Sequence, residues 1–433
     1  MSRERCDVAI VGAGAAGLFA GAFAGSANEG KVVLLEGAKR PGTKILIAGG
    51  GRCNVTHDVV RPGDYAGGSR NVVKKVLRSF TVEQTVAWFA QRGVELKRED
   101  TGKLFPVTDK ARTVLHALLG AVEQAGAELR TGQRVTGVTK HEDGLGFVVS
   151  IEGQPDLHAD RVVLATGGQA LPSSGSDGFG YDLAKHLGHS VTPTWPSLAP
   201  LLLEDGHWAT ALSGLALDVE LTLRGPTGKA LHCQSGPMLF THFGLSGPAP
   251  MNLSRHATPE LPRGATVTAN LMPGESFDSV EARLLRAAEH EPKRPVVKLL
   301  ATALPDRLAD ALLTRELGID ADKVFADLTR DDRRALAHAI MALKLPVTGD
   351  RGFKFAECTA GGVPVTEVEP ATMRSRVCDG LYLCGELLDV DGLIGGYNFQ
   401  WAWCTGRLAG LAASADAAAG IVPPCGARTS PTP

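Results

Sequence analysis

The sequence predicts an α/β fold, in which a Rossmann-like domain with a parallel sheet is interrupted by a β-rich domain and a helical domain. Three observations carry this prediction. Residues 6–36 read as strand, glycine-rich turn, helix, strand and acid, in that order. Residues 160–168 form another buried strand that ends in glycines, and residues 380–410 add a third strand followed by a long helix. Buried strands that alternate with helices are typical of parallel α/β sheets.

The first turn has the spacing GxGxxG. It follows the short apolar run VAIV at residues 8–11, which is typical of a buried strand, and an Ala-rich helix comes after it. Gly12 permits a tight turn, Gly14 has no side chain to hold a pyrophosphate away, and Gly17 lets the helix approach the sheet. The helix N-terminus directs amide N–H groups at phosphates. The predicted phosphate-binding turn consists of Gly12, Ala13, Gly14, Ala15, Ala16 and Gly17.

A second buried strand at residues 31–35 ends at Glu36. A carboxylate about 20 residues beyond the glycines is placed to accept hydrogen bonds from ribose hydroxyls. The same carboxylate would repel a 2′-phosphate, so the site favours FAD or NAD over NADP. Glycine-rich turns also occur without a ligand, but the complete order of elements predicts a dinucleotide site.

Length and composition set further bounds. A chain of 433 residues suggests two or three domains, and 44% hydrophobic with 21% charged residues is ordinary for a soluble, cytoplasmic protein. A net charge of −2 gives no electrostatic reason to expect nucleic acid. The eight cysteines show neither CxxC nor metal-ligand spacing, so we expect reduced thiols and no metal. The N-terminus imitates a secretory signal, but Asp7 interrupts it, and no apolar segment is long enough to span a membrane.

A glycine run at residues 49–51 precedes Arg52, Cys53 and Asn54. Three glycines are costly in backbone entropy unless the backbone must approach something closely. Arg52 offers a planar fork for a phosphate or a flavin carbonyl, and Asn54 offers both a donor and an acceptor. The alternative is a flexible surface turn. Cys53 is either a reactive thiol beside the flavin or a small packed side chain.

The stretch before the insertion predicts helices at residues 72–92 and 115–125, and short strands at 129–138 and 147–151. We expect these strands to form the small antiparallel layer of two-dinucleotide-fold flavoproteins. Arg134 and Val135 would then lie where backbone groups meet adenine, although the Arg134 side chain could equally serve packing. The buried strand at 160–164 runs into an ATG turn at Thr166 and Gly167.

In residues 190–275, apolar and polar residues alternate with the period of half-exposed strands, which predicts the β-rich domain. In residues 276–350, apolar residues recur with helical periodicity, which predicts the helical domain. His242 is either a donor or proton carrier that faces the flavin, or a structural histidine. Arginines of the helical part lie among as many acids, which favours a solvated face over nucleic-acid contact.

The chain then returns to the first domain, predicted over residues 1–189 and 351–418, with a disordered tail at 419–433. A strand at 381–384 is followed by Gly385 and Glu386, and an acid at such a strand end commonly binds the ribityl chain. Gly396, Tyr397 and Asn398 begin a long helix to residue 411. Its N-terminus can stabilise negative charge on the flavin during reduction.

Together these motifs resemble the BaiN/YhiN-like bacterial flavoproteins, also called aminoacetone oxidase family FAD-binding enzymes. The resemblance rests on GAGAAG at 12–17, KILIAGGGRCNVT at 44–56, LATGG at 164–168, LFTHFGLSGPA at 239–249, TAGGV at 359–363 and GELLDVDGLIGGYNFQWAW at 385–403. It implies an FAD-binding domain broken by a β domain and a helical domain, but no particular reaction. Cys358 and Cys404 stand where the resemblance leads us to expect Val or Ser, which argues against cysteine chemistry shared by the family but leaves open a role in this chain alone. Beyond the first turn, the expected FAD contacts are Glu36, Lys44, Gly50, Gly51, Arg52, Cys53, Asn54, Val135, Thr166, Gly167, Gly385, Glu386, Gly396, Tyr397 and Asn398.

Only one dinucleotide turn of this kind is visible in the sequence, so NAD(P)H, if it is the electron donor, must bind transiently. The first hypothesis is an FAD-dependent oxidoreductase that transfers hydride to or from a C=C or C–N bond of a small organic substrate. Arg52, Asn54, His242 and Tyr397 are the candidates for contacts near the reactive ring. The alternatives are a flavoprotein that modifies RNA and a redox-inert flavin-binding protein.

Overall fold

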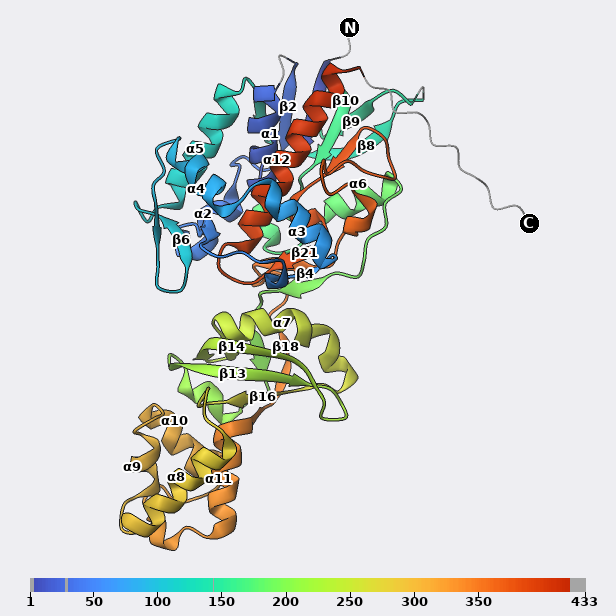
Figure 1. Cartoon of the computed structure of the whole chain (residues 1–433). Coiled ribbons are helices and arrows are strands. Elements are labelled where there is room, and N and C mark those ends of the chain that lie inside the picture. Colours follow the sequence, from blue (N-terminus) through green and yellow to red (C-terminus); the bar gives the residue numbers. More distant parts are fainter. Residues whose placement is uncertain (1–3, 28–29, 143, 421–433) are drawn as a thin grey trace, which may run out of the picture. The chain divides into compact units, whose positions relative to one another are not determined.

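The computed structural model describes residues 4–27, 30–142 and 144–420 (Figure 1). The chain divides into two compact units, one made of residues 1–194 with 358–433 and the other of Trp195–Glu357. The sequence predicts an inserted segment over residues 190–350, and both of its ends lie a few residues before the corresponding ends of the second unit. The segments expected to form separate β-rich and helical domains fall within the single second unit. The tail expected to be disordered lies, from residue 421 on, outside the described residues.

The first unit is built on a mixed sheet with the order β7-β2-β1-β10-β9-β8, and β20 pairs with β10. The pairs β7–β2, β2–β1, β1–β10 and β10–β20 are parallel, whereas β9 and β8 are antiparallel to their neighbours. The strands are β1 (Arg5–Val11), β2 (Val32–Glu36), β7 (Glu128–Thr131), β8 (Val135–Lys140), β9 (Phe147–Ile151), β10 (Leu157–Leu164) and β20 (Leu381–Leu383). Because the central strands are buried on both faces, they read as continuous apolar runs.

Two expectations for this unit are corrected. Residues 129–138 do not form one strand of the antiparallel layer, because β7 joins the parallel sheet beside β2 and only β8 pairs with β9. The single helix expected over 72–92 is broken into α3 (Arg70–Ser79) and α4 (Val82–Ala90). Phe80 ends the first in an extended conformation, and Thr81 caps the second in a capping box with Gln84.

Helices and short strands complete the unit. They are α1 (Ala15–Ala27), α2 (Thr43–Gly51), α5 (Ala111–Gln124), α6 (Phe179–His186), α12 (Tyr397–Ala418), β3 (Thr56–His57), β4 (Tyr65–Gly67), β5 (Leu96–Arg98), β6 (Lys103–Pro106), β19 (Cys358–Ala360) and β21 (Val390–Gly392). The long helix predicted after Gly396 is confirmed as α12, which lies beside α1 (Figure 1). A methyl group at Gly406 or Gly410 would lie 2.4 Å from the Ala16 carbonyl oxygen or 2.2 Å from that of Ala20. The two helices therefore touch along their backbones.

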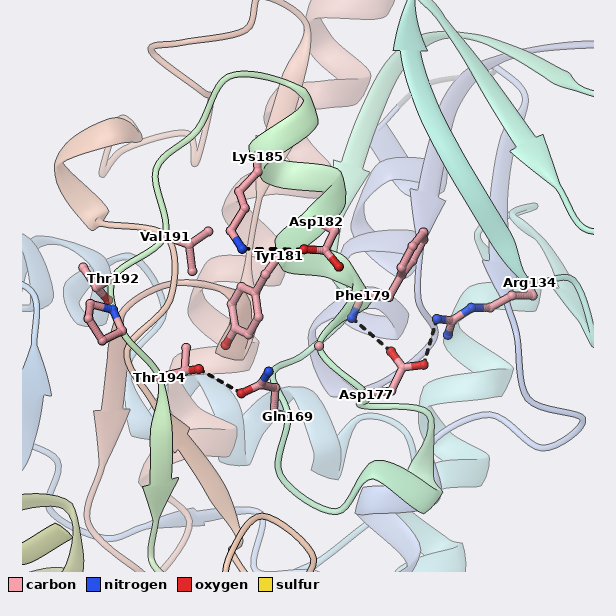
Figure 2. A pocket seen from close by; sticks show the side chains of 12 residues that line it. Arg134, Gln169, Asp177, Phe179, Tyr181, Asp182, Lys185, Val191, Thr192 and Thr194 are labelled. Carbon is pink, nitrogen blue, oxygen red and sulfur yellow. Dashed lines mark hydrogen bonds and ion pairs between the residues drawn. The ribbon is translucent and has the colours of Figure 1, made fainter. Parts of the chain in front are cut away.

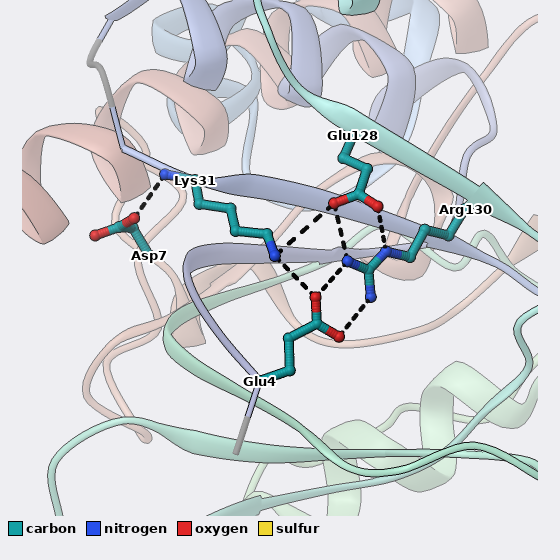
Figure 3. A network of polar contacts seen from close by, with 5 residues as sticks. All are labelled: Glu4, Asp7, Lys31, Glu128 and Arg130. Atoms are coloured by element: carbon teal, nitrogen blue, oxygen red, sulfur yellow. Dashed lines mark hydrogen bonds and ion pairs between the residues drawn. The ribbon is translucent and has the colours of Figure 1, made fainter. Parts of the chain in front are cut away.

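A charged network joins the starts of β1, β2 and β7 (Figure 3). The Glu4 carboxylate accepts hydrogen bonds from Arg130 at 2.6 and 3.0 Å and from Lys31 at 2.8 Å. Glu128 accepts from the same guanidinium at 2.8 Å. The hydrogen bonds from Arg130 and Lys31 lower the pKa of Glu4 to about 2. The network ties three neighbouring strands of the parallel sheet at one end.

This network predicts a pH dependence of stability. Because the folded-state pKa of Glu4 is depressed, its contribution is present above its ordinary value of 4.5 and is lost as the pH falls toward 2. We expect Glu4→Gln to lower the urea midpoint at pH 7 and to have a smaller effect at pH 3, where part of the contribution is already lost. Glu152→Gln, at an exposed site, is the control and is expected to change neither midpoint. An equal loss for Glu4→Gln at both pH values would contradict the prediction.

The second unit contains an antiparallel sheet with the order β17-β16-β13-β14-β15-β12-β18. The sheet consists of β12 (Leu201–Leu203), β13 (Ala216–Arg224), β14 (Ala230–Thr241), β15 (Gly244–Ser246), β16 (Thr266–Asn270), β17 (Leu343–Leu345) and β18 (Val347–Asp350), and the unit also contains β11 (Trp195–Ser197), which is not part of this sheet. Its helices are α7 (Pro248–Glu260), α8 (Phe277–His290), α9 (Val296–Leu300), α10 (Asp306–Ala311) and α11 (Arg330–Ala342). The sequence assigned 343–350 to the helical part, but β17 and β18 extend the sheet at both edges.

Candidate functional site

The glycine-rich turn joins the end of β1 to the start of α1 and lies against the end of β10. Gly12 has φ = +99°, and a methyl group there would lie 2.6 Å from the Ala165 carbonyl oxygen. A methyl group at Gly17 would lie 1.9 Å from the Gly12 carbonyl oxygen. The helix therefore packs on the turn itself, which makes glycine necessary at both positions.

Gly14 differs from these two glycines. A methyl group built on it meets no atom within 4 Å. Packing within the chain does not explain glycine here, whereas the close approach of a ligand would. This open position in front of α1 fits the pyrophosphate of a dinucleotide.

Glu36 holds the turn from the next strand. Its carboxylate accepts hydrogen bonds from the Ala13 N–H at 2.8 Å and from the Ala38 N–H at 2.8 Å. Each carboxylate oxygen can accept more than one hydrogen bond, so ribose hydroxyls remain possible donors. Glu36 thus has a structural role that the sequence did not predict, beside the predicted one.

The residues expected at the adenosine end of FAD lie around Glu36. A methyl group at Gly37 would lie 3.0 Å from the Arg134 Cδ, and one at Gly175 would lie 3.7 Å from the Glu36 Oε1. Arg134 pairs with Asp177 at 2.7 Å. Val135 is buried and pairs with Ile151, so only its backbone could meet a ligand. Asp177 was not predicted, because a lone acid in a glycine-rich loop has no distinguishing spacing.

The glycine run at the end of α2 adopts an unusual backbone. Gly49, Gly50 and Gly51 have φ of +57°, +70° and +85°, and Cys53 also has a positive φ of +63°. A methyl group at Gly50 meets no atom within 4 Å, whereas one at Gly49 would lie 2.8 Å from the Phe105 ring. Four left-handed residues within five positions fix a tight loop in place of a continuous helix. Its open face at Gly50 fits a ligand.

The three side chains after this run have different surroundings. Arg52 pairs with Glu99 at 2.5 Å and lies over the Phe105 ring at 4.0 Å. The Cys53 thiol is fully buried and burial raises its pKa, which favours a packed side chain over a reactive thiol. Asn54 is buried, and its Oδ1 has no hydrogen-bond partner among the described residues. Asn54 therefore remains the stronger candidate for a ligand contact, while Arg52 is engaged by acids.

Thr166 has a second unpartnered polar atom. Its Oγ1 is buried without a hydrogen bond among the described residues. It follows the end of β10, and Gly167 after it has φ = +74°. A buried polar atom left unpaired is costly. The Thr166 hydroxyl therefore fits a position that a bound ligand would satisfy.

Glu386 connects three segments that are far apart in the sequence. Its carboxylate accepts from the Lys44 ammonium at 2.7 Å and from the Thr359 N–H at 2.9 Å. Gly385 before it has φ = +74°, and a methyl group there would lie 2.8 Å from the Ala16 Cβ. This contact brings the late Gly-Glu motif to the first helix, next to the predicted phosphate-binding turn.

The start of α12 packs on β3, which follows the glycine run in the sequence. A methyl group at Gly396 would lie 2.5 Å from the Thr56 backbone. The Tyr397 ring stacks on His57 with centroids 4.8 Å apart. Burial raises the pKa of Tyr397 to about 12, so its hydroxyl is a donor at neutral pH. Tyr65 donates to the Tyr397 carbonyl at 2.8 Å.

Asn398 is committed to its own loop. Its Oδ1 accepts from the Gly392 N–H at 2.8 Å, and its Nδ2 donates to the Gly392 carbonyl at 3.1 Å. The Cys358 thiol also donates to Oδ1 at 3.5 Å. Asn398 thus shapes the turn before α12. Burial raises the pKa of both the Cys358 and Cys404 thiols, the latter to about 12, which disfavours thiolate chemistry at either.

His242 lies in the second unit, in the turn between β14 and β15, where its side chain is exposed and its ring meets Phe243. All other predicted site residues belong to the first unit. Thr359, which the prediction omitted, accepts hydrogen bonds from the Gln169 and Ala170 N–H groups at 2.8 and 3.0 Å and so fixes the loop after β10.

Across the described residues, no group of acidic, histidine or cysteine side chains could hold a metal ion. The same residues contain no helix with the length and apolar character that a membrane crossing requires.

The chain matches the family model described as HI0933-like protein Rossmann domain over residues 6–412. It is 36% identical over 415 residues to a Clostridium scindens protein named 3-dehydro-bile acid delta(4,6)-reductase, covering 94% of this chain and 98% of that protein. It is 35% identical over 405 residues to an Escherichia coli protein named ribosomal RNA dihydrouridine synthase, covering 92% and 96%. A Haemophilus influenzae protein with the same name is 32% identical, covering 94% and 98%.

A solved structure supports the fold alone. The 3-ketosteroid-delta4-(5alpha)-dehydrogenase from Rhodococcus jostii RHA1, in complex with 4-androstene-3,17-dione, has a TM-score of 0.50 at 16% identity, covering 95% of this chain and 97% of that chain. The family model covers nearly the whole chain, and the resemblance seen in the motifs is confirmed. The chain therefore belongs to the HI0933-like family of Rossmann-fold flavoprotein oxidoreductases.

Proposed function

We propose that this protein is an FAD-dependent reductase of a C=C bond conjugated to a carbonyl group in a small organic substrate. The main support is the convergence of the Gly12–Gly17 turn, the Lys44–Glu386 pair and the start of α12 within one unit. The names of the relatives point to one type of chemistry, because a Δ4,6-reductase and a dihydrouridine synthase both add hydrogen across a C=C bond.

In this proposal, FAD extends from the first turn to the start of α12. The open position at Gly14 and the N-terminus of α1 hold the pyrophosphate. Glu36 accepts from the ribose, and the backbone at Val135 meets the adenine. Glu386 binds the ribityl chain from the position that Lys44 and the Thr359 N–H fix. We also propose that FAD contacts Thr166, Gly167, Gly50, Gly51, Asn54, Gly385 and Gly396.

When bound, FAD supplies a ring that accepts a hydride and passes it on. The protein contributes orientation and charge. The N-terminus of α12 stabilises negative charge at the edge of the ring. Tyr397, with its pKa raised to about 12, acts as a hydrogen-bond donor to the substrate more readily than as an acid. Asn54 offers its unpaired Oδ1 to a donor on the ring or the substrate.

The electron donor is proposed to be a nicotinamide nucleotide that binds transiently. One glycine-rich turn of the dinucleotide type stands in the sequence, and the FAD assigned to it leaves no second such turn for NAD(P)H. The nucleotide would therefore be held by contacts other than a second turn of this kind.

A second candidate substrate is a uracil base in RNA, which also contains a C=C bond conjugated to a carbonyl. The observation that favours it is the name shared by two relatives at 35% and 32% identity. Against it stands the net charge of −2, because RNA binding relies on basic surface. Salt-sensitive binding of ribosomal RNA would favour this candidate over the small substrate.

The proposal is tested by anaerobic half-reactions of the purified protein. We expect bound FAD with absorbance near 450 nm, bleaching by NADH or NADPH, and return of the absorbance on adding a carbonyl-conjugated alkene. A saturated ketone is the control and should leave the flavin reduced. Reoxidation by unmodified ribosomal RNA alone would select the second candidate. A flavin that neither nucleotide nor dithionite bleaches would instead indicate a redox-inert binding protein.

A further inference from the structure

A pocket of about 590 Å³ opens between α6 and the segment 191–194 of the first unit (Figure 2). Its walls come from α6, the loop after β10 and the residues that precede the second unit. Arg134 and Asp177, which belong to the expected adenosine end of the FAD site, lie at its rim, and none of the other residues expected to contact FAD lines it. A volume of this size is in the range of small-molecule sites.

Tyr181 of α6 lines the pocket and is 3% exposed. Its hydroxyl has no hydrogen-bond partner among the described residues. Burial and the nearby Glu386 carboxylate raise the pKa of Tyr181, so the hydroxyl keeps its proton and can donate. A buried hydroxyl without a partner costs stability, and its retention beside a pocket indicates that a ligand pairs with it.

Gln169 lines the same pocket and supplies a second donor (Figure 2). Its Oε1 accepts a hydrogen bond from the Thr194 hydroxyl at 2.8 Å. With the oxygen engaged, the amide group presents its N–H donors, and its Nε2 would lie 2.8 Å from a methyl group on Gly178, itself a pocket residue. Two donors at one pocket match a carbonyl oxygen, which accepts two hydrogen bonds.

The charges around the pocket disfavour a charged ligand. At the rim, Arg134 pairs with Asp177 at 2.7 Å and Lys185 with Asp182 at 3.6 Å, so the two signs balance. Glu386, the charged group nearest in effect to Tyr181, is itself paired with Lys44 at 2.7 Å, so neither sign is in excess on that side either. The chemistry of the walls therefore favours a neutral, polar ligand.

We propose that this pocket binds an uncharged carbonyl compound, whose oxygen accepts hydrogen bonds from the Tyr181 hydroxyl and the Gln169 amide. The inference rests on the proposed function for its ligand class and deepens it by giving the carbonyl of the substrate two donors. The pocket also adjoins the proposed flavin site. A methyl group on Gly168 would lie 2.8 Å from the Glu386 Oε1, and Gln169 is the next residue.

The test compares Tyr181→Phe with the wild-type protein, full length and without added substrate. Cyclohex-2-enone and uridine are the probes, and saturation-transfer NMR or calorimetry gives their affinity. We expect at least one probe to bind, and Tyr181→Phe to weaken it about tenfold. Uridine 5′-monophosphate should bind less tightly than uridine because of its charge. The melting temperature of Tyr181→Phe should be unchanged or raised, since an unpaired hydroxyl is removed.

Tyr382→Phe is the matched control. The Tyr382 hydroxyl is buried and hydrogen-bonded to Asp416. Its removal should lower the melting temperature and leave probe affinity unchanged. The inference is overturned if neither probe binds, if Tyr181→Phe binds both as tightly as the wild type, or if it melts as low as Tyr382→Phe. The two proposals can fail separately. If probe binding depends on Tyr181 but no alkene reoxidises the reduced flavin, the proposed function is wrong and the binding site stands. If an alkene does reoxidise the flavin but Tyr181→Phe binds the probes with unaltered affinity, the proposed function stands and the binding site is wrong.

Discussion

Replacing Gly14 with valine is expected to lower the affinity for FAD at least about 100-fold, which corresponds to about 2.7 kcal/mol, and to leave the apoprotein folded. A Cβ atom built on Gly14 meets no atom of the described residues within 4 Å, so we expect the fold to tolerate a side chain there. It would occupy the space in front of α1 where the pyrophosphate is proposed to lie. Titration of the apoprotein with FAD, followed by flavin fluorescence, measures the loss.

Gly17→Ala is the matched comparison at the same turn. Its methyl group would lie 1.9 Å from the Gly12 carbonyl oxygen, an overlap that requires α1 to move away from the sheet. We expect this smaller substitution to lower the melting temperature strongly, whereas Gly14→Val leaves it within a few degrees. FAD binding by Gly14→Val at wild-type affinity would show that the pyrophosphate lies elsewhere.

The second large effect is expected from Gln400→Leu in α12. Gln400 is 1% exposed, and its Oε1 accepts hydrogen bonds from the hydroxyls of Thr56 at 2.7 Å and Thr85 at 3.0 Å. Its Nε2 donates to the Phe80 carbonyl at 2.8 Å. Leucine would remove all three hydrogen bonds at a cost of about 2–4 kcal/mol. The Thr56 hydroxyl would lose its partner, whereas the Thr85 hydroxyl keeps the Thr81 carbonyl at 3.1 Å and the Phe80 carbonyl keeps the Cys404 thiol at 3.2 Å. Urea unfolding followed by circular dichroism measures the difference.

Gln84→Leu provides the same chemical change at an exposed site. Gln84 accepts from the Thr81 N–H at 2.8 Å in the capping box of α4, and losing this contact should cost about 1 kcal/mol or less. Because Gln400 joins α12 to β3 and α4, its loss should also weaken FAD binding at the start of α12. A destabilisation no larger than that of Gln84→Leu would mean that water or a rearranged core satisfies the two threonines.

The sequence was informative where local rules suffice. The GxGxxG turn, the acid at Glu36 and the helix that starts after Gly396 all depend on backbone geometry and strand burial, which short stretches encode. It was misleading at residues 129–138, where an apolar alternation does not reveal which partner strand it will meet. β7 pairs with β2 because the sheet continues there, and that is a long-range choice.

The chemical state of the candidate side chains also depended on distant neighbours. Arg52 lies beside Glu99, Lys44 beside Glu386 and Asn398 against Gly392, and no spacing in the sequence connects the first two pairs. No sequence pattern singles out Tyr181 as a site residue, because a tyrosine in a short helix is typical of a core position. Only the pocket beside it and its unpaired hydroxyl distinguish it.

By itself, the sequence determined the dinucleotide turn, the order of the elements and the family to which they belong, since these follow from glycines and apolar runs at fixed local spacing. The tertiary structure alone decided which polar atoms find a hydrogen-bond partner and which buried ones have none among the described residues. The physical reason is that a hydrogen bond or an ion pair forms between atoms a few ångströms apart, and folding brings together residues as distant as Lys44 and Glu386.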